Sequence, residues 1–557
     1  MTAASAAAAL LAGFGSAGAQ TQAPVVFWAS DPVRPGDTVM AFGAGFGAQP
    51  AVEVARLPDG SAGEPGAAAA AWPRGGVPTP AIQPGDTSVK FTLPPDLKPG
   101  VFAYRIAGAG GAAVGLLNRP AVWWALGDAG VAARPGGWVR LFGKNLAREK
   151  RPKTRVRLTG PKAVTLEPES AGAHEVKVNL PGDLPPGAYR VFLHNGDGGG
   201  AAWSDAADLR VETPPAWPQT VFDVKTFGAD ATGLTDSTPA IQTALAKARE
   251  AGGGIVLFPR GRYQVTGTLA IPRRTVLRGE RQNLACVFWP ETDAPPNSWL
   301  AGSNSFGIED LTLYCSNYKT LLDADTQGED AGDVFLRRVR VRANVYRGHI
   351  KPEEADRRYR EGIKVGFGGG YWLAKLGGRN IEVTDCDLDS AGNTLSLTRA
   401  RGVRVERNVL GIGRWGGCGV FGGDGLLFAD NDFPGTDMAS GCGPGGLGYG
   451  NLSNLCLIRN TCSRYYGING EAITSDAPGG FYSGPVAAGD PAGITLPKAL
   501  SGGDPRRMIG AAVYVVAGKG AGQWRRVAGI DGPRVTADRP WQSAPDATSV
   551  VAIAWLL

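Results

Sequence analysis

The sequence predicts a mostly β protein in which two small antiparallel β-sandwiches precede a long stack of β-strand coils. Three observations support this prediction: a composition rich in turn-forming residues, a duplicated pattern in residues 24–212, and a coil-length repeat after residue 300. The 557 residues include 83 glycines and 41 prolines, while 19% are charged and 43% are hydrophobic. Short strands joined by turns fit this composition better than helical bundles do, and the length implies several domains.

Residues 1–19 resemble a secretory signal peptide. Residues 6–14 form an apolar core, and the small residues 17–19 precede Gln20 as a cleavage site requires. No lysine or arginine occurs before Arg34, so a longer signal with an upstream start, or a disordered alanine-rich leader, stays open. We expect a secreted, periplasmic or cell-surface protein without a membrane span, since no apolar run reaches the ~18 residues that a spanning helix needs.

The positive charge is concentrated in one segment. The net charge is only +6, but residues 337–364 contain ten basic and four acidic residues. Arg338, Arg340 and Arg342 alternate there, and we expect an acidic polymer to relieve their mutual repulsion. A nucleic-acid partner is not expected, because export is expected and the basic segment does not alternate basic with aromatic residues for base stacking.

All seven cysteines lie at or after Cys286, without a CxxC pair. This spacing excludes a metal finger. Several of the cysteines fall at positions expected to face a β core, where a buried thiol behaves as a small hydrophobic group.

Residues 24–117 and 120–212 repeat one pattern. The first copy has "PGDTVMAFGAGFG" from Pro35 and "LPPDLKPGVFAYRI" from Leu93, and the second has "PGGWVRLFGKNL" from Pro135 and "LPGDLPPGAYRVFL" from Leu180. In each, a Pro-Gly turn starts an alternating strand and a proline-rich turn leads into a later one. Both copies resemble IPT/TIG immunoglobulin-like modules. The resemblance implies Ig-like β-sandwiches that space or bind.

Residues 222–265 follow a proline-rich linker and carry a strand, a helix and a "GGGIVLFP" strand. Thr238 is the expected N-cap with Pro239 at the first helical position, and the glycines 252–254 end the helix. This order resembles the pectate-lyase superfamily, in its rhamnogalacturonase/epimerase-like branch. The resemblance implies a right-handed parallel β-helix over residues 220–483, with this segment as a non-catalytic end cap.

Six nine-residue segments support a coiled repeat. Their second, fourth and ninth positions are always apolar, as expected for side chains that face the interior of stacked coils. Their start-to-start steps are 28, 47, 22, 23 and 29 residues. The long step is either two coils or one coil with an excursion at residues 344–378. The segments start at Ser305, Asp333, Asn380, Gly402, Gly425 and Asn454.

Two columns of the repeat predict contacts between coils. The seventh position holds Asn408, Asn431 and Asn460, which we expect to form an asparagine ladder in a turn, because buried amides need partners. The sixth position alternates in charge, which predicts salt bridges between neighbouring coils. Its members are Asp385, Arg407, Asp430 and Arg459.

A calcium site is possible but not favoured, and other cofactors stay unknown. Asp385, Asp387 and Asp389 alternate along one expected strand and could offer oxygen ligands. Calcium takes six or more oxygens, and Arg407 would neutralise the nearest carboxylate.

If the asparagine turn joins the second and third strands of each coil, the first strands are residues 394–400, 418–424, 446–451 and 471–476. The family resemblance implies that a sugar chain lies along this face. The catalytic candidates are Arg399, Asp424, Tyr449, Glu471 and Asp476. The substrate-binding candidates are Arg414, Trp415, Asn451, Lys351 and His349.

The favoured reaction is β-elimination on an acidic, uronate-containing polysaccharide. It needs a cation to neutralise the sugar carboxylate, for which Arg399, Arg414 or the basic excursion could serve. It also needs a base for the adjacent proton, drawn from Tyr449, Lys351 or His349.

Three alternatives stay open. Hydrolysis would use two carboxylates from Asp424, Glu471 and Asp476, although the residue series of polygalacturonases is absent. A uronate epimerase would share the proton-abstraction step. A non-catalytic carbohydrate-binding rod or adhesin is the third, because a fold does not imply a function. The sugar, its linkage and the oligomeric state stay open.

Residues 484–557 read as a small β-rich insertion or appended module, with alternating strands in residues 510–541. The sequence ends on the apolar "VVAIAWLL". Because solenoids need capped ends, we expect the natural chain to continue beyond it.

Overall fold

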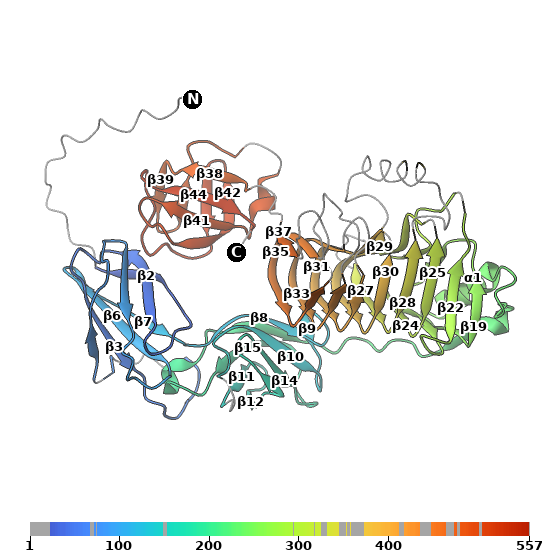
Figure 1. Ribbon diagram of the computed structural model, residues 1–557, viewed down its shortest axis with the longest axis horizontal. Coiled ribbons are helices and arrows are strands. Elements are labelled where there is room, and N and C mark those ends of the chain that lie inside the picture. The colour runs from blue at the N-terminus through green and yellow to red at the C-terminus, as the bar shows by residue number, and fades with distance from the viewer. Residues whose placement is uncertain are drawn as a thin grey trace.

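The structure is a computed structural model, and it is mostly β, as predicted (Figure 1). It describes residues 23–555 with internal gaps. The gaps are residues 67–71, 74, 149–152, 293, 317, 325–330, 345–352, 354–356, 358–371, 391, 412–416, 435–446, 464–472, 476–479 and 501–503. The expected signal peptide therefore lies outside the described residues.

Residues 25–117 form a sandwich of two antiparallel sheets around their own core, which includes Phe46, Phe91 and Phe102. One sheet has the order β1 (Val25–Ala29), β2 (Thr38–Ala44) and β5 (Ser88–Thr92). The other has the order β4 (Val77–Thr79), β3 (Ala51–Arg56), β6 (Phe102–Gly108) and β7 (Gly111–Leu117).

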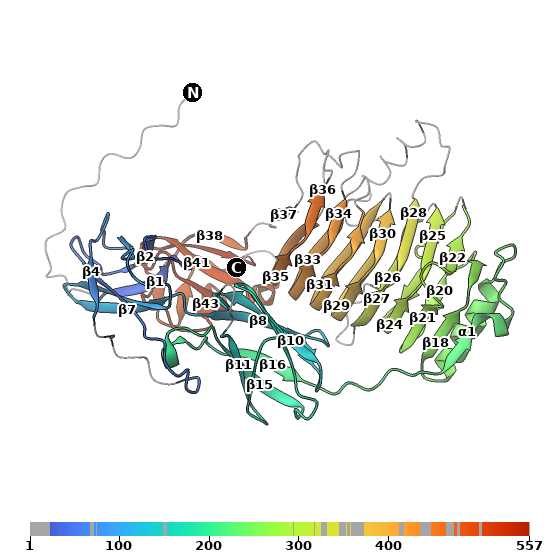
Figure 2. The ribbon, with the colours of Figure 1, turned by 60° about the horizontal axis from the view of Figure 1, so that its bottom comes forward.

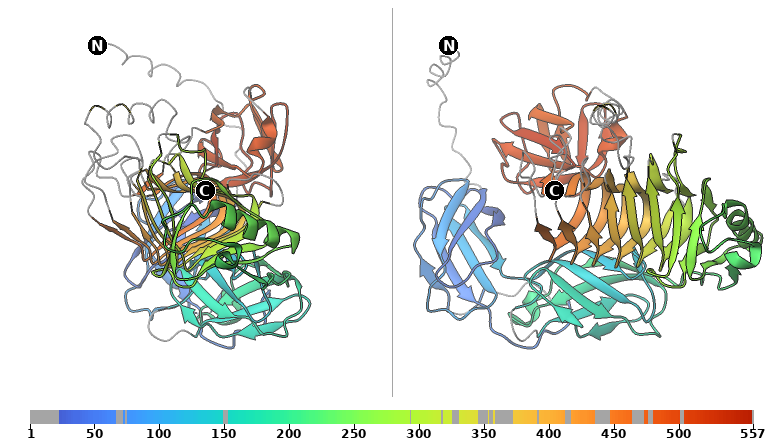
Figure 3. Two further views of the ribbon diagram at one scale, coloured as in Figure 1. Left: turned by 90° about the vertical axis from the view of Figure 1, so that its right-hand side faces the viewer. Right: turned by 45° about the vertical axis from the view of Figure 1, so that its right-hand side comes forward.

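Residues 121–211 form a second sandwich with a separate core. Its first sheet is β13 (Ser170–Ala171), β14 (Glu175–Asn179), β10 (Trp138–Lys144) and β8 (Ala121–Gly127). Its second sheet is β12 (Val164–Leu166), β11 (Arg155–Thr159), β15 (Gly187–His194), β16 (Ala207–Val211) and β9 (Ala132–Ala133). This second sandwich lies along the side of the β-helix, as Figures 1 and 3 show.

The end cap of the β-helix has the predicted order. β17 (Val221–Asp223) is followed by α1 (Thr238–Glu250), which covers the open end of the stack (Figure 2). The helix N-cap is Ser237 rather than Thr238, and Thr238 starts the helix with its backbone N–H bonded to Asp236 at 3.0 Å. Ile241 and Leu245 are buried against the first coils, which closes the core at this end.

Each coil of the β-helix has three strands, called A, B and C in chain order, and strands of one kind stack in parallel (Figure 2). In the later coils the A and B strands merge into one long bent strand. The separate A strands are β20 (Leu269–Ile271), β23 (Leu300–Gly302), β26 (Thr320–Ala324) and β37 (Ile473–Ser475). The separate B strands are β18 (Gly254–Phe258), β21 (Thr275–Gly279), β24 (Asn304–Glu309) and β27 (Gly332–Arg337). The merged strands are β29 (Trp372–Thr384), β31 (Asn393–Glu406), β33 (Cys418–Ala429) and β35 (Leu447–Ile458). The C strands are β19 (Gly261–Gln264), β22 (Ala285–Trp289), β25 (Thr312–Ser316), β28 (Arg340–Asn344), β30 (Asp387–Ser390), β32 (Val409–Leu410), β34 (Asp432–Pro434) and β36 (Thr461–Ser463).

In the six repeat segments the chain bends at both ends of the B strand through left-handed backbone positions. The first and sixth residues of all six repeat segments have positive φ angles, for example 54° at Asn380 and 56° at Asp385. Asparagine, aspartate and glycine tolerate this conformation best, which explains why they recur at the first position. These two bends per repeat fix the cross-section of the coil.

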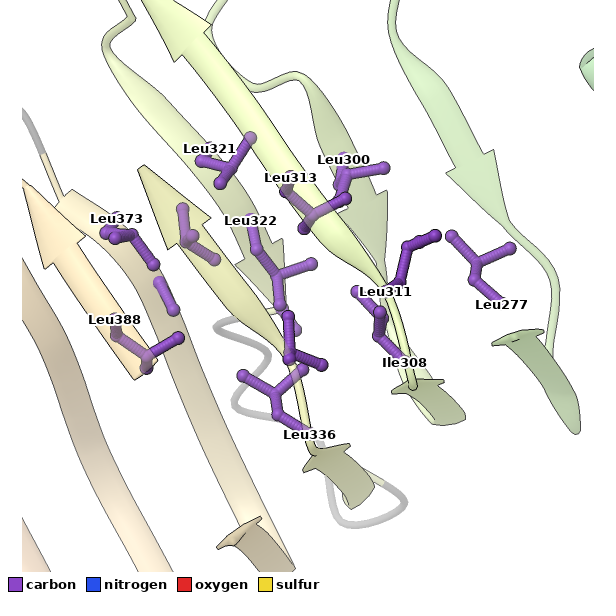
Figure 4. Close-up of a cluster of buried hydrophobic side chains, with 14 of the residues drawn as sticks. Leu277, Leu300, Ile308, Leu311, Leu313, Leu321, Leu322, Leu336, Leu373 and Leu388 are labelled. Atoms are coloured by element: carbon purple, nitrogen blue, oxygen red, sulfur yellow. The ribbon is translucent and has the colours of Figure 1, made fainter. Parts of the chain in front are cut away.

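The interior is a continuous stack of aliphatic side chains. Leu277, Ile308 and Leu336 on successive B strands point inward and meet Leu313 and Leu388 from the C strands (Figure 4). These residues are nearly fully buried. As expected, Cys315, Cys386 and Cys418 belong to this core as free thiols.

The 47-residue step is one coil with an excursion. Strand β28 pairs directly with β30, so that Arg340 lies beside Asp387. Strand β27 pairs in the same way with the second half of β29. The extra residues therefore lie between β28 and β29 and add no further coil.

The asparagine ladder is confirmed. The side-chain amide of Asn408 donates to Asn431 Oδ1 at 2.9 Å, and that of Asn431 donates to Asn460 Oδ1 at 2.9 Å. Each side-chain oxygen also accepts the backbone N–H of the preceding rung, at 3.0 Å in both cases. The ladder satisfies polar groups that the turn buries.

The predicted salt bridges of the sixth column are also confirmed. Arg407 binds both carboxylate oxygens of Asp385, at 2.8 and 2.9 Å. Arg459 binds Asp430 in the same bidentate way, at 2.6 and 2.9 Å.

Residues 482–554 form a separate antiparallel unit with its own core, above the first sandwich in Figure 1. The C-terminal "VVAIA" is a strand inside its sheet, so those apolar residues contribute to a core there. The strands are β38 (Tyr482–Pro485), β39 (Ala488–Asp490), β40 (Gly493–Thr495), β41 (Ala512–Ala517), β42 (Trp524–Asp531), β43 (Arg534–Ala537) and β44 (Val550–Ala554).

Candidate functional site

The outer surface of the A strands, called the A face, carries small and polar side chains. One outward column joins Asp323, Lys375, Ser396 and Gly419 as neighbours on successive coils. A second column joins Gly377, Thr398, Phe421 and Gly450. Phe421 is 48% exposed, whereas the residues between these columns point into the core. Along these two columns Asp323, Lys375 and Thr398 are partly exposed and Phe421 is exposed, whereas Ser396 is buried.

A basic row borders the A face where the A strands bend into the B strands. Arg379, Arg401 and Asp424 are direct neighbours on successive coils, and all three are exposed. We call Arg379, Arg399 and Arg401 the basic row. Arg399 lies just before the bend with a φ angle of 49°. Neighbouring coils are ~4.8 Å apart, so Arg379 and Arg401 are like charges at close range.

The carboxylates near the basic row are engaged elsewhere or distant. Asp424 Oδ1 accepts hydrogen bonds from Ser453 Oγ at 2.8 Å and Asn454 Nδ2 at 2.7 Å, both on the next coil. The nearest ion-pair partner of Arg379 is Asp333 at 3.9 Å. Within the described residues, no carboxylate lies within 4.0 Å of the Arg401 guanidinium.

Many of the arginines on the other two faces have carboxylate partners. This corrects the expectation for Arg338, Arg340 and Arg342, because each of them is paired with a carboxylate within the protein. Arg338 binds Asp310 on the preceding coil, at 2.6 and 2.7 Å. Arg340 and Arg342 both bind Asp387 on the next, at 3.1 and 2.7 Å. Other such pairs are Arg278–Glu309, Arg337–Glu382, Arg404–Glu382, Arg407–Asp385 and Arg459–Asp430.

Glu382 shows how firmly these pairs are held. Burial alone would raise the pKa of this carboxyl, but the hydrogen bond from Arg337 and the charges of Arg404 and Arg337 outweigh burial. The pKa of Glu382 therefore lies below its ordinary value. Among the described residues, the ion pair nearest to Arg379 is the longer one to Asp333, at 3.9 Å.

Two of the three aspartates considered as calcium ligands are paired with arginines instead. Asp385 lies in the bend before β30 rather than on the strand with Asp387 and Asp389. Asp385 binds Arg407, and Asp387 binds Arg340 and Arg342. Over the described ranges, no cluster of three or more histidine, cysteine, aspartate or glutamate residues could hold a metal ion.

Four of the candidates from the sequence fall in described strands. The segments expected as first strands do align in register, since Leu395, Cys418, Leu447 and Ile473 are successive neighbours. Arg399 and Asp424 are exposed at the bend, as the site hypothesis requires. The side chain of Asn451, within β35, lies outside the described residues.

Tyr449 faces the wrong way for a catalytic role. Its neighbours on the preceding coils are Val420 and Leu397, both in the core, and its ring packs against that core. The outward positions of this strand are Gly448 and Gly450, one residue to either side. A shift of one residue reverses the face of a side chain, so Tyr449 is left out of the site.

The remaining candidates lie outside the described residues. They are Glu471, Asp476, Arg414, Trp415, Lys351 and His349. In the sequence, His349, Lys351, Arg414, Trp415 and Glu471 all belong to connections that lead from a C strand to the next A strand.

Lys375, Arg379, Arg401 and Phe421 were missed by the sequence analysis. Arg379 and Arg401 each immediately precede the start of a repeat segment, and Asp424 does the same one coil later. That common offset was the signal that could have identified the row.

The described carboxylates on this side are too far apart for hydrolysis. Asp323 and Asp424 are separated by three coil steps, which at ~4.8 Å each amount to about 14 Å. Paired hydrolytic carboxylates lie about 5 to 9.5 Å apart.

A family model described as "Rhamnogalacturonase A/epimerase, pectate lyase-like" matches residues 221–288. Mannuronan C5-epimerase AlgE5 of Azotobacter vinelandii is 32% identical over 142 residues, covering 22% of this chain and 14% of the relative. Alginate lyase 7 of the same organism is 52% identical over 46 residues, covering 8% and 5%. The pre-neck appendage protein of Bacillus phage B103 is 25% identical over 201 residues, covering 34% and 22%. The matched part is thus less than a quarter of each relative's length.

Solved structures similar to this chain include the A-module of mannuronan C-5 epimerase AlgE6 from Azotobacter vinelandii. It is 16% identical with a TM-score of 0.23, over 46% of this chain and 87% of that one. A family 28 exopolygalacturonase of Yersinia enterocolitica is 12% identical with a TM-score of 0.28, over 63% and 87%. None of the helices in the described ranges is long and apolar enough to cross a membrane.

The stacked parallel sheets and the capping helix define the central part of the chain as a parallel β-helix. With the family match to its first coils, this β-helix belongs to the pectate-lyase-like superfamily.

Proposed function

We propose that this protein acts on an acidic, uronate-containing polysaccharide that lies along the A face, and that it cleaves the polymer by β-elimination. The observation that carries the proposal is the basic row. Arg379 and Arg401 are exposed neighbours on adjacent coils. Unlike the arginines that form close ion pairs on the other faces, Arg379 has its nearest described carboxylate, that of Asp333, at 3.9 Å. A polymer with repeated carboxylates would offset the repulsion between Arg379 and Arg401, and a guanidinium binds a carboxylate in a bidentate geometry.

The row also suits the reaction. In β-elimination a base removes the proton at C5 of the uronate, the C4–O4 bond breaks, and a C4–C5 double bond forms. Neutralising the carboxylate stabilises the negative charge that develops beside C5. Arg399 or Arg401 would hold that carboxylate, and O4 leaves with the departing chain after it takes up a proton.

With Tyr449 turned into the core, His349 and Lys351 are the remaining bases among the sequence candidates, and both lie outside the described residues. Phe421 would contact a sugar ring, because its exposed aromatic ring lies one coil from Thr398 on the A face.

Epimerisation is the second candidate. Its support is the 32% identity to a mannuronan C5-epimerase, which covers only 142 residues. An epimerase would remove the same C5 proton and return one to the opposite face, without breaking the C4–O4 bond. Hydrolysis is less favoured because Asp323 and Asp424 lie about 14 Å apart. A non-catalytic binding rod would use the same surface, and the resemblance to a phage appendage protein keeps this option open.

The test is a panel of acidic polysaccharides incubated with the full chain, with and without EDTA. Absorbance of the unsaturated uronate product and release of reducing ends are recorded together, in deuterated water. Growth of both signals supports a lyase. Deuterium at C5 without either signal identifies an epimerase, and reducing ends alone identify a hydrolase. Loss of activity in EDTA would show a dependence on calcium or another cation. We also propose that the protein is secreted.

A further inference from the structure

The outward side of the B strands, called the B face, changes character along the β-helix. The third and fifth residues of the repeat segments point outward there. In the earlier coils they are mostly charged, as in Glu382, Arg404 and Glu406. In the last two coils they are Leu427, Ala429, Cys456 and Ile458. Leu427 and Ala429 are fully buried although they point away from the β-helix core. Something must therefore cover this part of the B face.

The second sandwich provides the cover. Trp124, Leu126 and Phe142 form one apolar cluster with Leu427 and Ala429. Trp124 and Phe142 are stacked, with ring centroids 4.1 Å apart, outside the sandwich's own core. The adjacent Trp123 is 62% exposed, whereas Trp124 is 8% exposed. The docking therefore depends on one of two neighbouring tryptophans.

Charged groups extend this interface on both sides. Arg140 of the sandwich lies 2.7 Å from Glu406 of the β-helix and 3.1 Å from Glu175 of its own sheet. Glu175 in turn binds Arg459 of the β-helix at 2.9 Å. Glu406 is 1% exposed, so its charge depends on this arrangement.

The interface reaches the bends that carry the basic row. The backbone N–H of Val131 donates to Asn380 Oδ1 at 3.1 Å, and Asn380 directly follows Arg379. A side chain on Gly130 would collide with the Gly402 carbonyl, and Gly402 directly follows Arg401. Gly402 has a φ angle of 64°, and a Cβ on it would lie 2.4 Å from the Val131 nitrogen. The sandwich thus packs tightly against two bends.

We propose that the second sandwich is a positioning element for the basic row rather than a tethered binding module. It covers the B face around Leu427 and Ala429 and holds the bends at Asn380 and Gly402, and through them the backbone from which Arg379 and Arg401 project. The docking follows from the contacts alone. The effect on polymer binding rests on the function proposed above.

The test compares Trp124→Asp with the matched control Trp123→Asp in the full chain. Both variants introduce the same charge at adjacent positions, but only Trp124 lies in the interface. We expect amide hydrogen exchange in residues 378–382 and 399–406 to accelerate at least tenfold in Trp124→Asp and to stay unchanged in Trp123→Asp. Unchanged exchange in Trp124→Asp overturns the proposal. Leu427→Ala, which weakens the same cluster from the β-helix side, serves if Trp124→Asp does not fold.

The second readout is the Kd for polyuronate. We expect Trp124→Asp to weaken binding at least threefold, with Trp123→Asp binding as the unmodified protein does. Faster exchange with an unchanged Kd leaves the docking in place but refutes the positioning role. If the unmodified protein binds no polyuronate while exchange still responds, the proposed function fails and the docking stands.

Discussion

Replacing Asn431 by alanine removes the central described rung of the asparagine ladder. The Asn431 side chain is 2% exposed and takes part in four hydrogen bonds. Its oxygen accepts from the backbone and side-chain N–H groups of Asn408, and its amide donates to Val405 O and Asn460 Oδ1. Alanine leaves these four partners without the amide that satisfied them.

The expected loss is about 4 kcal/mol, because each hydrogen bond contributes about 1 kcal/mol net. Asn460 is a matched comparison at the edge of the ladder. It is only half-buried and makes three such bonds, so water replaces part of what Asn460→Ala removes. We expect a loss of about 1 to 2 kcal/mol there.

The assay is native-state hydrogen exchange in residues 403–410 and 426–432. A local measurement is needed because a chain of several domains does not unfold in a single two-state step. A loss of about 4 kcal/mol lowers protection roughly a thousandfold where these amides exchange through opening of the coils. Protection that falls less than tenfold in Asn431→Ala, or equally in both variants, would refute the reasoning.

Three further predictions concern acid stability, thiol reactivity and the exposed ring. The hydrogen bond from Arg459 holds the pKa of Asp430 below its ordinary value of 3.8. The ionised Asp430–Arg459 pair therefore contributes its full stability above pH 3.8, and this stability is lost as the pH falls through the lower pKa of the folded protein. Asp430→Asn should therefore flatten the fall in β-helix melting temperature below about pH 4, and an unchanged slope would contradict this. Burial raises the pKa of Cys386 and Cys418 to about 12, so iodoacetamide at pH 8 should label exposed Cys462 well before either, as peptide mass spectrometry can check. Phe421→Ala should weaken polyuronate binding roughly fivefold through lost ring contact and leave the melting temperature within about 1 °C, and unchanged binding would exclude the ring from the site.

The coil architecture could be predicted because it depends on local periodicity. Apolar residues at fixed positions define the stacking of the coils. The ladder of Asn408, Asn431 and Asn460 can form only when neighbouring coils are aligned in one register. The opposite charges of Asp385 and Arg407 follow from the same register. To predict these contacts, it is enough to know which residues lie one coil apart in the sequence.

The orientation of single side chains near the bends could not be predicted in the same way. Residues with left-handed backbone conformation interrupt the inward–outward alternation of side chains. The alternation followed along one strand therefore does not predict which side chains point outward in the next strand. Tyr449 was therefore expected on the outer face and lies against the core. Arg340 and Arg342 were expected to repel one another, but their partner Asp387 is 45 to 47 residues away, beyond the excursion.

The docking of the second sandwich depends on contacts between distant segments. The change from Arg404 to Leu427 at one outward position did signal a covered surface. The sequence could not tell which segment covers it, because Trp124 and Phe142 also fit a sandwich core. Such a pairing is set by shape and by burial of both surfaces together.

The most direct test of the central claim is polyuronate binding by a charge-reversed basic row. Arg379→Glu/Arg401→Glu is compared with Arg190→Glu/Arg210→Glu, which reverses two exposed charges on the second sandwich. The account predicts that only the first variant loses binding, by at least tenfold at physiological ionic strength, while both keep the melting temperature of the unmodified protein. Equal binding by the two variants would show that the A face and its basic row do not hold the polymer.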